Sequence, residues 1–127
     1  MGEAMSEMRF GRVQFRIMQV LWDKGRANAR EITAALNKIE PIAHSTVQTL
    51  LRKLEQKGAV DHDIDDRTFI FFPLVRSDKV TQHAFRDFVD KIFAGSTGGL
   101  VSYLIKNEYI SPDELGKIRE LLDEKES

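Results

Sequence analysis

The first part of the chain is a series of short amphipathic segments separated by Gly and Pro. Apolar residues recur at helical spacing in residues 11–24, and Gly25 follows them where a left-handed helix cap is favoured. Asn28 followed by Glu31 is typical of the capping box that begins a helix, and this second helix should end before Pro41. The pattern therefore predicts two short helices in succession.

A third helix is expected over residues 44–58, with the sequence HSTVQTLLRKLEQKG and a terminal glycine. Its apolar residues fall within one narrow sector of the helical wheel, as on a face that packs against a core: Val47, Leu50, Leu51 and Leu54. The opposite side offers hydroxyls and an amide in the first turns and cations in the later turns. This division leaves the polar side free to contact a partner.

The residues after the third helix predict a β-hairpin. Val60, His62 and Ile64 alternate with acidic residues, the turn sequence DDR follows, and residues 68–72 are rich in strand-forming side chains. Three helices followed by a hairpin is the order of elements in a winged helix, which is a helix-turn-helix with an added hairpin. We assign residues 1–76 to this domain.

Residues 77–127 predict three more helices. A long helix over residues 78–94 is broken by the sequence GSTGG, and a further helix covers residues 100 to about 108. The sequence SPDEL begins the last helix, with its serine as the cap and its glutamate as the reciprocal partner. The predicted fold is mainly α with a small β-hairpin: an N-terminal winged helix-turn-helix followed by a C-terminal three-helix dimerisation region.

Dimerisation is expected because the C-terminal helices carry more apolar surface than so short a segment can bury alone. Segments of fewer than about 60 residues bury a small fraction of their surface and usually need oligomerisation. The alternative is a monomer in which these helices pack back onto the winged helix. The expected dimer interface residues are Phe85, Phe88, Val89, Ile92, Leu100, Leu104, Leu115, Ile118 and Leu122.

The polar face of the third helix has the composition of a helix that reads the major groove of DNA. Gln48 can pair with adenine, and the methyl group of Thr49 can contact a thymine methyl. Arg52 and Lys53 can reach phosphates or a guanine, and Arg67 at the hairpin tip can lie along the backbone or in the minor groove. The expected DNA-binding residues are Ser45, Thr46, Gln48, Thr49, Arg52, Lys53 and Arg67.

An ordinary solvated helix face would look similar, because Lys, Arg and Gln are common on such faces. Glu55 is the only acid from His44 to Val60, and the flanking elements are those of a winged helix, so the sequence favours DNA binding. The predicted hairpin argues against it, because four aspartates there would repel phosphate unless they point away: Asp61, Asp63, Asp65 and Asp66.

The overall charge is near neutral, with a formal net charge of −1 over 127 residues. Residues 1–76 hold 12 Lys and Arg against 10 Asp and Glu, whereas residues 77–127 hold 7 against 10. Neither part has the strong positive charge of a typical nucleic-acid-binding domain. The prediction of DNA binding therefore rests on where the charges lie.

Nothing in the sequence indicates an enzyme. The chain has no cysteine, its three histidines lack metal-ligand spacing, and no Gly-rich phosphate loop is present. We expect no catalytic residue, no metal and no cofactor. The longest apolar runs are far shorter than the roughly 20 residues that span a bilayer, so we expect a cytoplasmic protein without a membrane segment.

These residues resemble the penicillinase repressors of the BlaI/MecI type, a family of bacterial winged-helix repressors. The resemblance covers nearly the whole chain, and its most specific parts are VLW, TVQTLLRKLEQKG, and KNE after the long aromatic helix. It implies a homodimer, held by the C-terminal helices, that binds a dyad-symmetric operator and blocks transcription. It also implies that the DNA contacts fall on the face of Ser45, Thr46, Gln48, Thr49 and Arg52.

The resemblance says less about how DNA is released. In the penicillin-responsive members, a membrane-bound β-lactam sensor triggers proteolysis at an Asn-Phe bond just before the equivalent of KNE. Here Tyr103 and Leu104 stand where that bond would be, so the motif for a regulatory protease is not matched. Copper-responsive relatives carry a C-terminal cysteine cluster, which this chain lacks. The alternative function is a winged-helix protein-interaction module without sequence-specific DNA binding.

Overall fold

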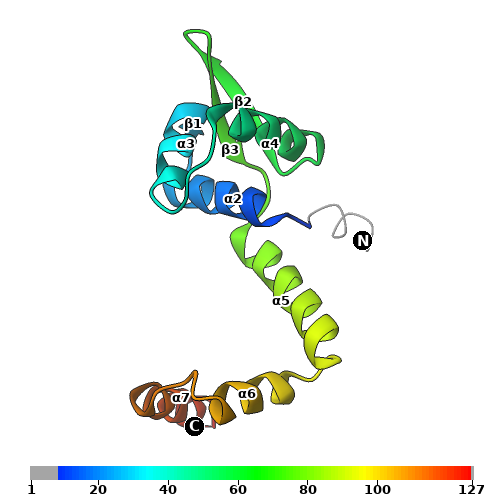
Figure 1. The fold of residues 1–127 in the computed structure, drawn as a ribbon, viewed down its shortest axis with the longest axis vertical. Coiled ribbons are helices and arrows are strands. Elements are labelled where there is room, and N and C mark those ends of the chain that lie inside the picture. The colour runs from blue at the N-terminus through cyan, green and yellow to red at the C-terminus, as the bar shows by residue number, and fades with distance from the viewer. Residues whose placement is uncertain (1–8, 127) are drawn as a thin grey trace. The chain divides into compact units, whose positions relative to one another are not determined.

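The computed structural model describes residues 9–126. Six of the elements precede residue 74, and three long helices follow (Figure 1). In chain order they are α2 (Arg12–Lys24), β1 (Ala27–Asn28), α3 (Ala29–Asn37), α4 (His44–Gln56), β2 (Val60–Asp65), β3 (Thr68–Pro73), α5 (Ser77–Phe93), α6 (Thr97–Lys106) and α7 (Pro112–Glu126).

The first two helices begin and end where the local sequence predicts. Helix α2 ends at Gly25, whose φ of 83° is accessible to glycine at little cost. Helix α3 begins with the predicted capping box: Glu31 N donates to Asn28 Oδ1 at 2.8 Å, and Asn28 N donates to Glu31 Oε1 at 3.0 Å. Both arrangements depend on residues close in sequence, which explains why the pattern predicts them.

The predicted hairpin is present but belongs to a three-stranded antiparallel sheet with the order β1-β3-β2. Strand β1 pairs Ala27 with Phe71 and Asn28 with Ile70. The expectation of two strands was therefore incomplete. A strand of two residues is too short to show a period-two pattern, and it forms because the chain between α2 and α3 passes along the free edge of β3.

The core of the winged helix lies between its helices and the sheet. Helix α4 contributes the residues that the helical wheel predicts, with Val47, Leu51 and Leu54 fully buried and Leu50 partly buried. Trp22 at the end of α2 donates from Nε1 to the carbonyl oxygen of Val75 at 2.9 Å, which ties the end of the sheet to α2. The other buried members are Ile17, Met18, Leu21, Ala27, Ile32, Leu36, Ala59, Val60 and Phe71.

The C-terminal helices differ from expectation at one point. Helix α6 begins at Thr97 rather than at Leu100, because the Ser96 hydroxyl accepts a hydrogen bond from Gly99 N at 2.9 Å and so caps the helix. The cap of α7 agrees with the prediction, since Glu114 N donates to Ser111 Oγ at 3.2 Å. Neither α6 nor α7 has a buried residue.

The chain divides into two compact units between Ala84 and Phe85, inside α5. This division falls slightly later than the predicted domain boundary after residue 76. The part before it is the winged-helix unit, and the part after it is the C-terminal unit. Within residues 9–126, no helix has the length and apolar character needed to cross a bilayer.

Candidate nucleic-acid interface

Helix α4 presents an exposed polar face opposite its buried side. All six of its predicted contact residues are exposed: Ser45, Thr46, Gln48, Thr49, Arg52 and Lys53. The hydroxyl of Thr49 donates to the carbonyl oxygen of Ser45 at 3.0 Å, which turns this hydroxyl back to the helix. The N-terminus has no side-chain cap, since the preceding residue is Ala43. Its first amides are therefore available to an acceptor such as a phosphate oxygen.

Polar contacts fix α4 relative to the two helices before it. Asn37 at the end of α3 donates from Nδ2 to the carbonyl oxygen of Ile42 at 3.0 Å and accepts from Ile42 N at 3.2 Å. Glu40 in the same turn accepts from Arg12 and Arg16 of α2, each at 2.7 Å. These contacts hold the turn between α3 and α4, so they set the position of the exposed face of α4.

The acidic residues of the wing do not all face α4. Side chains alternate along a strand, so His62 and Ile64 share one face of the hairpin, while Asp63 and Asp65 lie on the other. Strand pairing aligns Ile64 with Phe69, which faces α4. Asp63 on the far face forms an ion pair with Arg26. Asp63 and Asp65 therefore point away from the exposed face of α4, and so does the repulsion that they would exert on phosphate.

The tip of the wing is a two-residue turn with an unusual backbone. Asp66 and Arg67 have φ values of 48° and 68°, as in the type I′ turn that joins antiparallel strands tightly. This conformation costs a residue with a β-carbon about 1–2 kcal/mol. Arg67 is exposed and forms no hydrogen bond or ion pair with residues 9–126. A strained residue with a free guanidinium at a tip suggests a binding role.

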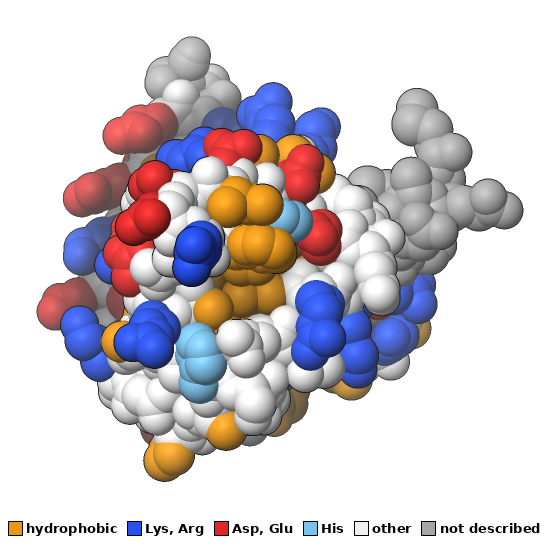
Figure 2. All heavy atoms as spheres, turned by 90° about the horizontal axis from the view of Figure 1, so that it is seen from above, with side chains coloured by type: hydrophobic (Ala, Val, Ile, Leu, Met, Phe, Trp, Pro, Cys, Tyr) orange, Lys and Arg blue, Asp and Glu red, His pale blue; other side chains and the backbone are white. Residues whose placement is uncertain are grey.

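A groove of about 700 Å³ lies between α4 and the wing. Figure 2 shows hydrophobic side chains in the middle of this face of the molecule, between groups of Lys and Arg side chains. The groove brings together three of the predicted residues, Gln48, Arg52 and Arg67. Its other lining residues are Asn28, Ala29, Arg30, His44, Leu51, Thr68, Phe69 and Phe71.

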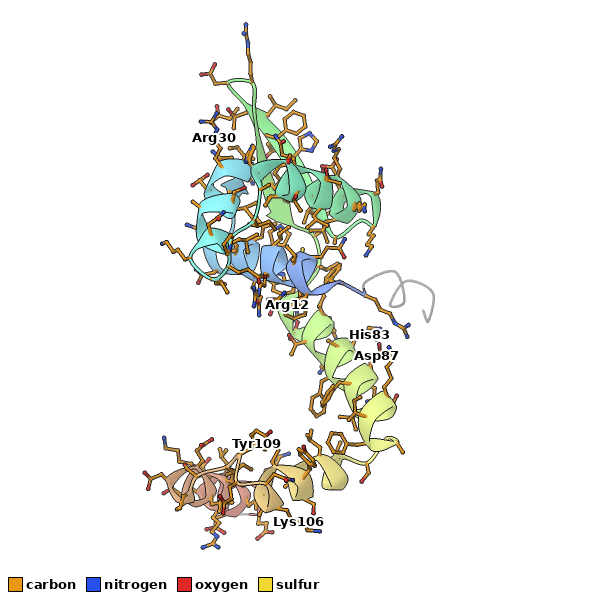
Figure 3. All side chains as sticks on the ribbon, in the orientation of Figure 1. Arg12, Arg30, His83, Asp87, Lys106 and Tyr109 are labelled. Carbon is orange, nitrogen blue, oxygen red and sulfur yellow. The ribbon has the colours of Figure 1, made fainter. Side chains whose placement is uncertain are left out.

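Arg30 is a member of this face that the sequence reasoning missed, and His44 lines the same groove. Arg30 projects from the first turn of α3 beside the wing (Figure 3) and has no partner within residues 9–126. His44 is held by Thr33, whose Oγ1 lies 3.2 Å from His44 Nδ1. The helix before a DNA-reading helix usually crosses the DNA backbone, so a cation in its first turn was a usable signal for Arg30.

Lys53 lies outside the groove, beside Gln14, Gln56 and Lys57. The Lys57 ammonium is already used, since Nζ donates to the carbonyl oxygen of Arg9 at 2.9 Å and to Gln14 Oε1 at 3.3 Å. Lys53 makes no such contact with the described part of the chain. The predicted residues therefore form two groups on α4, one in the groove and one beside it.

The structure also brings Glu55, Asp61 and His62 together, with one potential ligand atom from each within 4.8 Å of the others. His62 Nδ1 is hydrogen-bonded to the Glu55 carboxylate, and the His62 ring stacks on Phe69 with 3.9 Å between ring centroids. Asp61 accepts from the backbone amide of His62 at 2.8 Å, so we assign the pair of His62 and Glu55 to joining α4 to the wing.

The C-terminal unit places the predicted interface residues mostly on its surface. Phe85, Phe88 and Ile92 are exposed along α5, whereas Val89 is buried within the chain. The other predicted interface residues lie in α6 and α7. Ile118 and Leu122 are exposed, and Leu100, Leu104 and Leu115 are partly buried. Further large apolar residues that the prediction omitted are also exposed: Val101, Tyr103, Ile105, Tyr109 and Leu121.

The bond between Tyr103 and Leu104 lies inside α6. Its flanking carbonyl groups are hydrogen-bonded, since Asn107 N donates to Tyr103 O at 3.1 Å and Tyr109 N donates to Leu104 O at 3.0 Å. The Tyr103 ring packs edge-on against Phe93, with 5.8 Å between centroids, and stacks on Tyr109 (labelled in Figure 3) at 6.1 Å. This segment is therefore ordered helix rather than an extended loop.

A helix with an exposed polar face, held by two preceding helices and followed by a β-hairpin, defines a winged helix-turn-helix protein. The model of the penicillinase repressor family matches residues 10–124, and the chain belongs to that family.

Individual relatives support the same assignment. The methicillin resistance regulatory protein MecI of Staphylococcus aureus (strain N315) is 26% identical over 112 residues, which are 88% of this chain and 91% of MecI. The penicillinase repressor of Bacillus licheniformis is 24% identical over 111 residues, or 87% of each chain. The solution structure of the DNA-binding domain of the repressor BlaI has a TM-score of 0.51 and 27% identity, and it covers 56% of this chain and 87% of that domain.

Proposed function

We propose that the protein is a transcriptional repressor that binds a dyad-symmetric operator as a homodimer and blocks transcription by occupying it. The observation that carries the proposal is the exposed face of α4, where Gln48 and Arg52 stand beside a wing that ends in Arg67. Membership of the penicillinase repressor family supports it. A repressor of this kind acts in the bacterial cytoplasm, which contains the chromosome.

The exposed side chains divide into base-reading and backbone-binding roles. Gln48 pairs with adenine through its amide, and the methyl group of Thr49 contacts a thymine methyl. Ser45 and Thr46, in the first turn of α4, bind phosphate or a base edge through their hydroxyls. The cations Arg52, Lys53 and Arg67 bind phosphates. Arg52 additionally lies where a guanine could be read.

The homodimer brings two copies of α4 to successive major grooves, about one helical turn (~34 Å) apart. The exposed apolar side chains of the C-terminal unit form the contact between copies, and this contact makes binding at the two half-sites mutually dependent. This mechanism does not depend on a regulatory protease, whose motif is not matched at Tyr103 and Leu104. Proteases prefer exposed, extended segments, whereas the bond between these residues lies in hydrogen-bonded helix.

The test is selection of bound duplexes from a random pool by the purified full chain at near-physiological salt, with the solution mass measured on the same sample. We expect enrichment of an inverted repeat and the mass of a dimer. Selection is repeated with the variant Gln48→Ala/Arg52→Ala, which should lose the enrichment, and with Lys125→Ala, a cation of α7 that should keep it. A stable dimer with no enriched sequence would instead favour a protein-interaction module, because an adaptor has no reason to prefer one duplex.

A further inference from the structure

The groove between α4 and the wing has an apolar floor that DNA binding does not require. Phe69 forms the exposed part of this floor, and the buried core side chains of Leu51 and Phe71 lie beneath it. Phosphates and base edges are bound by charges and hydrogen bonds, for which an aromatic floor offers little. The volume of about 700 Å³ falls within the roughly 300–1,000 Å³ that is typical of small-molecule sites.

One side chain of the floor is a preformed stacking surface. Phe69 is 45% exposed although its ring is already stacked on one side by His62, with 3.9 Å between centroids and 8° between planes. His62 is in turn held by Glu55 of α4. The Phe69 ring is therefore fixed in place, and its open side is available to another planar group.

The rim of the groove carries positive charge without internal partners. Arg30, Arg52 and Arg67 come from α3, α4 and the wing, and none of their guanidinium groups forms a hydrogen bond or ion pair with residues 9–126. A guanidinium matches the geometry of a carboxylate through two parallel hydrogen bonds. Gln48 and Asn28 add neutral polar groups to the same rim.

We propose that this groove is an effector site for a small aromatic carboxylate and that occupancy of the site releases DNA. The aromatic body of the ligand stacks on Phe69 over the apolar floor, and its carboxylate binds the guanidinium groups of the rim. Release follows because Gln48 and Arg52 cannot serve the ligand and DNA together. Release of DNA by the ligand rests on the proposed repressor function. Such release would induce transcription without cleavage of the chain.

The ligand site is tested on the isotopically labelled full chain by nuclear magnetic resonance titration with 2-naphthoate, with neutral 2-naphthamide as the matched probe. We expect the amide signals of Gln48, Arg52 and Phe69 to shift and 2-naphthamide to bind at least about tenfold more weakly, because it lacks the charge that pairs with the rim. Shifts that map outside the groove, or equal binding of the two probes, would overturn the proposal.

Two variants test the contributions of the floor and of the rim to ligand binding separately. Phe69→Ala should weaken 2-naphthoate at least about tenfold, whereas Ile39→Ala, which removes an exposed apolar side chain of the turn before α4, should have no effect. Arg30→Met keeps the floor and should weaken 2-naphthoate severalfold while leaving 2-naphthamide unchanged. This second variant keeps the test valid if Phe69→Ala disturbs the wing. No effect of Arg30→Met on 2-naphthoate would contradict the role of the rim.

Competition with DNA tests release by the ligand at constant ionic strength, which is essential because phosphate contacts are salt-dependent. At a 2-naphthoate concentration ten times its own Kd, direct competition raises the apparent Kd for the selected duplex about tenfold. Selective DNA binding that 2-naphthoate leaves unchanged would overturn release and leave the repressor function standing. Binding of 2-naphthoate in the groove without selective binding of any duplex would instead overturn the repressor function and release together, and leave the ligand site.

Discussion

The two units of the chain differ most in how they bury their apolar side chains. The winged-helix unit has a contiguous core whose largest members, including Ile17, Leu51 and Leu54, are fully buried. Helices α6 and α7 bury no residue, and large apolar side chains such as Ile92 and Leu121 are more than 60% exposed. The winged-helix unit is therefore stabilised by its own contacts. The C-terminal unit leaves a large apolar surface exposed, as proteins with interaction surfaces do.

The two units are also suited to different kinds of function. The unit with the complete core holds its exposed polar side chains in fixed places, as contacts with bases require. The C-terminal unit, which buries few side chains, contributes apolar surface, which is suited to association. A variant in one unit should thus change stability or DNA contacts, and a variant in the other should change the mass in solution.

The largest expected effect is the loss of a core side chain in α4. Leu54 is fully buried, so Leu54→Ala should lower the free energy of unfolding by about 2–5 kcal/mol through lost burial and a residual cavity. Ile39→Ala, at a position 61% exposed, should cost about 0.5 kcal/mol or less. Denaturant unfolding monitored by circular dichroism measures both. Equal small losses would mean that the winged-helix unit is not stabilised by the core to which Leu54 belongs.

A charged side chain on the apolar surface of the C-terminal unit should act on assembly. Phe88→Glu and Leu104→Glu should each weaken dimerisation by about 2–4 kcal/mol, because apolar burial is lost and a carboxylate is desolvated. Analytical ultracentrifugation over a range of concentrations measures the shift toward monomer. The control is Lys79→Glu on α5, outside the predicted interface. If neither substitution changed the mass, these side chains would belong to an internal core and the proposed dimer interface would be wrong.

Much of the fold could be predicted because its signals are local. The capping boxes at Asn28 and Ser111 and the glycine after α2 depend on residues a few positions apart, and the structure confirms them. Strand β1 could not be predicted, because it exists only through pairing with β3, which is distant in sequence. The early start of α6 could not be predicted for another reason: two glycines usually interrupt a helix, whereas here Ser96 caps them into its first turn.

The candidate site was predictable along α4 and at the wing tip, where Arg67 lines the groove as expected. Helical periodicity placed the polar residues of α4 on the exposed side, where the structure has them. Periodicity within one element cannot indicate which other elements border that side, so the contribution of Arg30 from α3 and of the Phe69 ring from the wing was missed. The orientation of the wing aspartates was left open by the sequence and is settled by strand pairing for Asp63 and Asp65.

Two substitutions on α4 should separate base reading from phosphate binding without changing the dimer mass. Gln48→Ala should cost roughly 1–3 kcal/mol on the selected operator and little on random DNA, because it removes a base contact. Lys53→Ala should weaken all duplexes alike and reduce the salt slope by about 1, because it removes one phosphate contact. Fluorescence anisotropy at several salt concentrations measures both. Equal losses on operator and random DNA for both variants would contradict these roles.

The smallest effect should come from the wing tip, where stability and DNA binding are expected to move in opposite directions. Arg67 has a φ of 68°, so Arg67→Gly should relieve backbone strain and leave the free energy of unfolding unchanged or raised by up to about 1 kcal/mol. The same variant loses a cation that has no partner within residues 9–126, so DNA affinity should fall severalfold and the salt slope should decrease. Arg67→Lys keeps the charge and the strain, and it should retain most of the affinity. A glycine variant that is more stable and binds DNA as well as the parent would show that Arg67 makes no phosphate contact, and DNA binding would then not explain why a strained arginine occupies the wing tip.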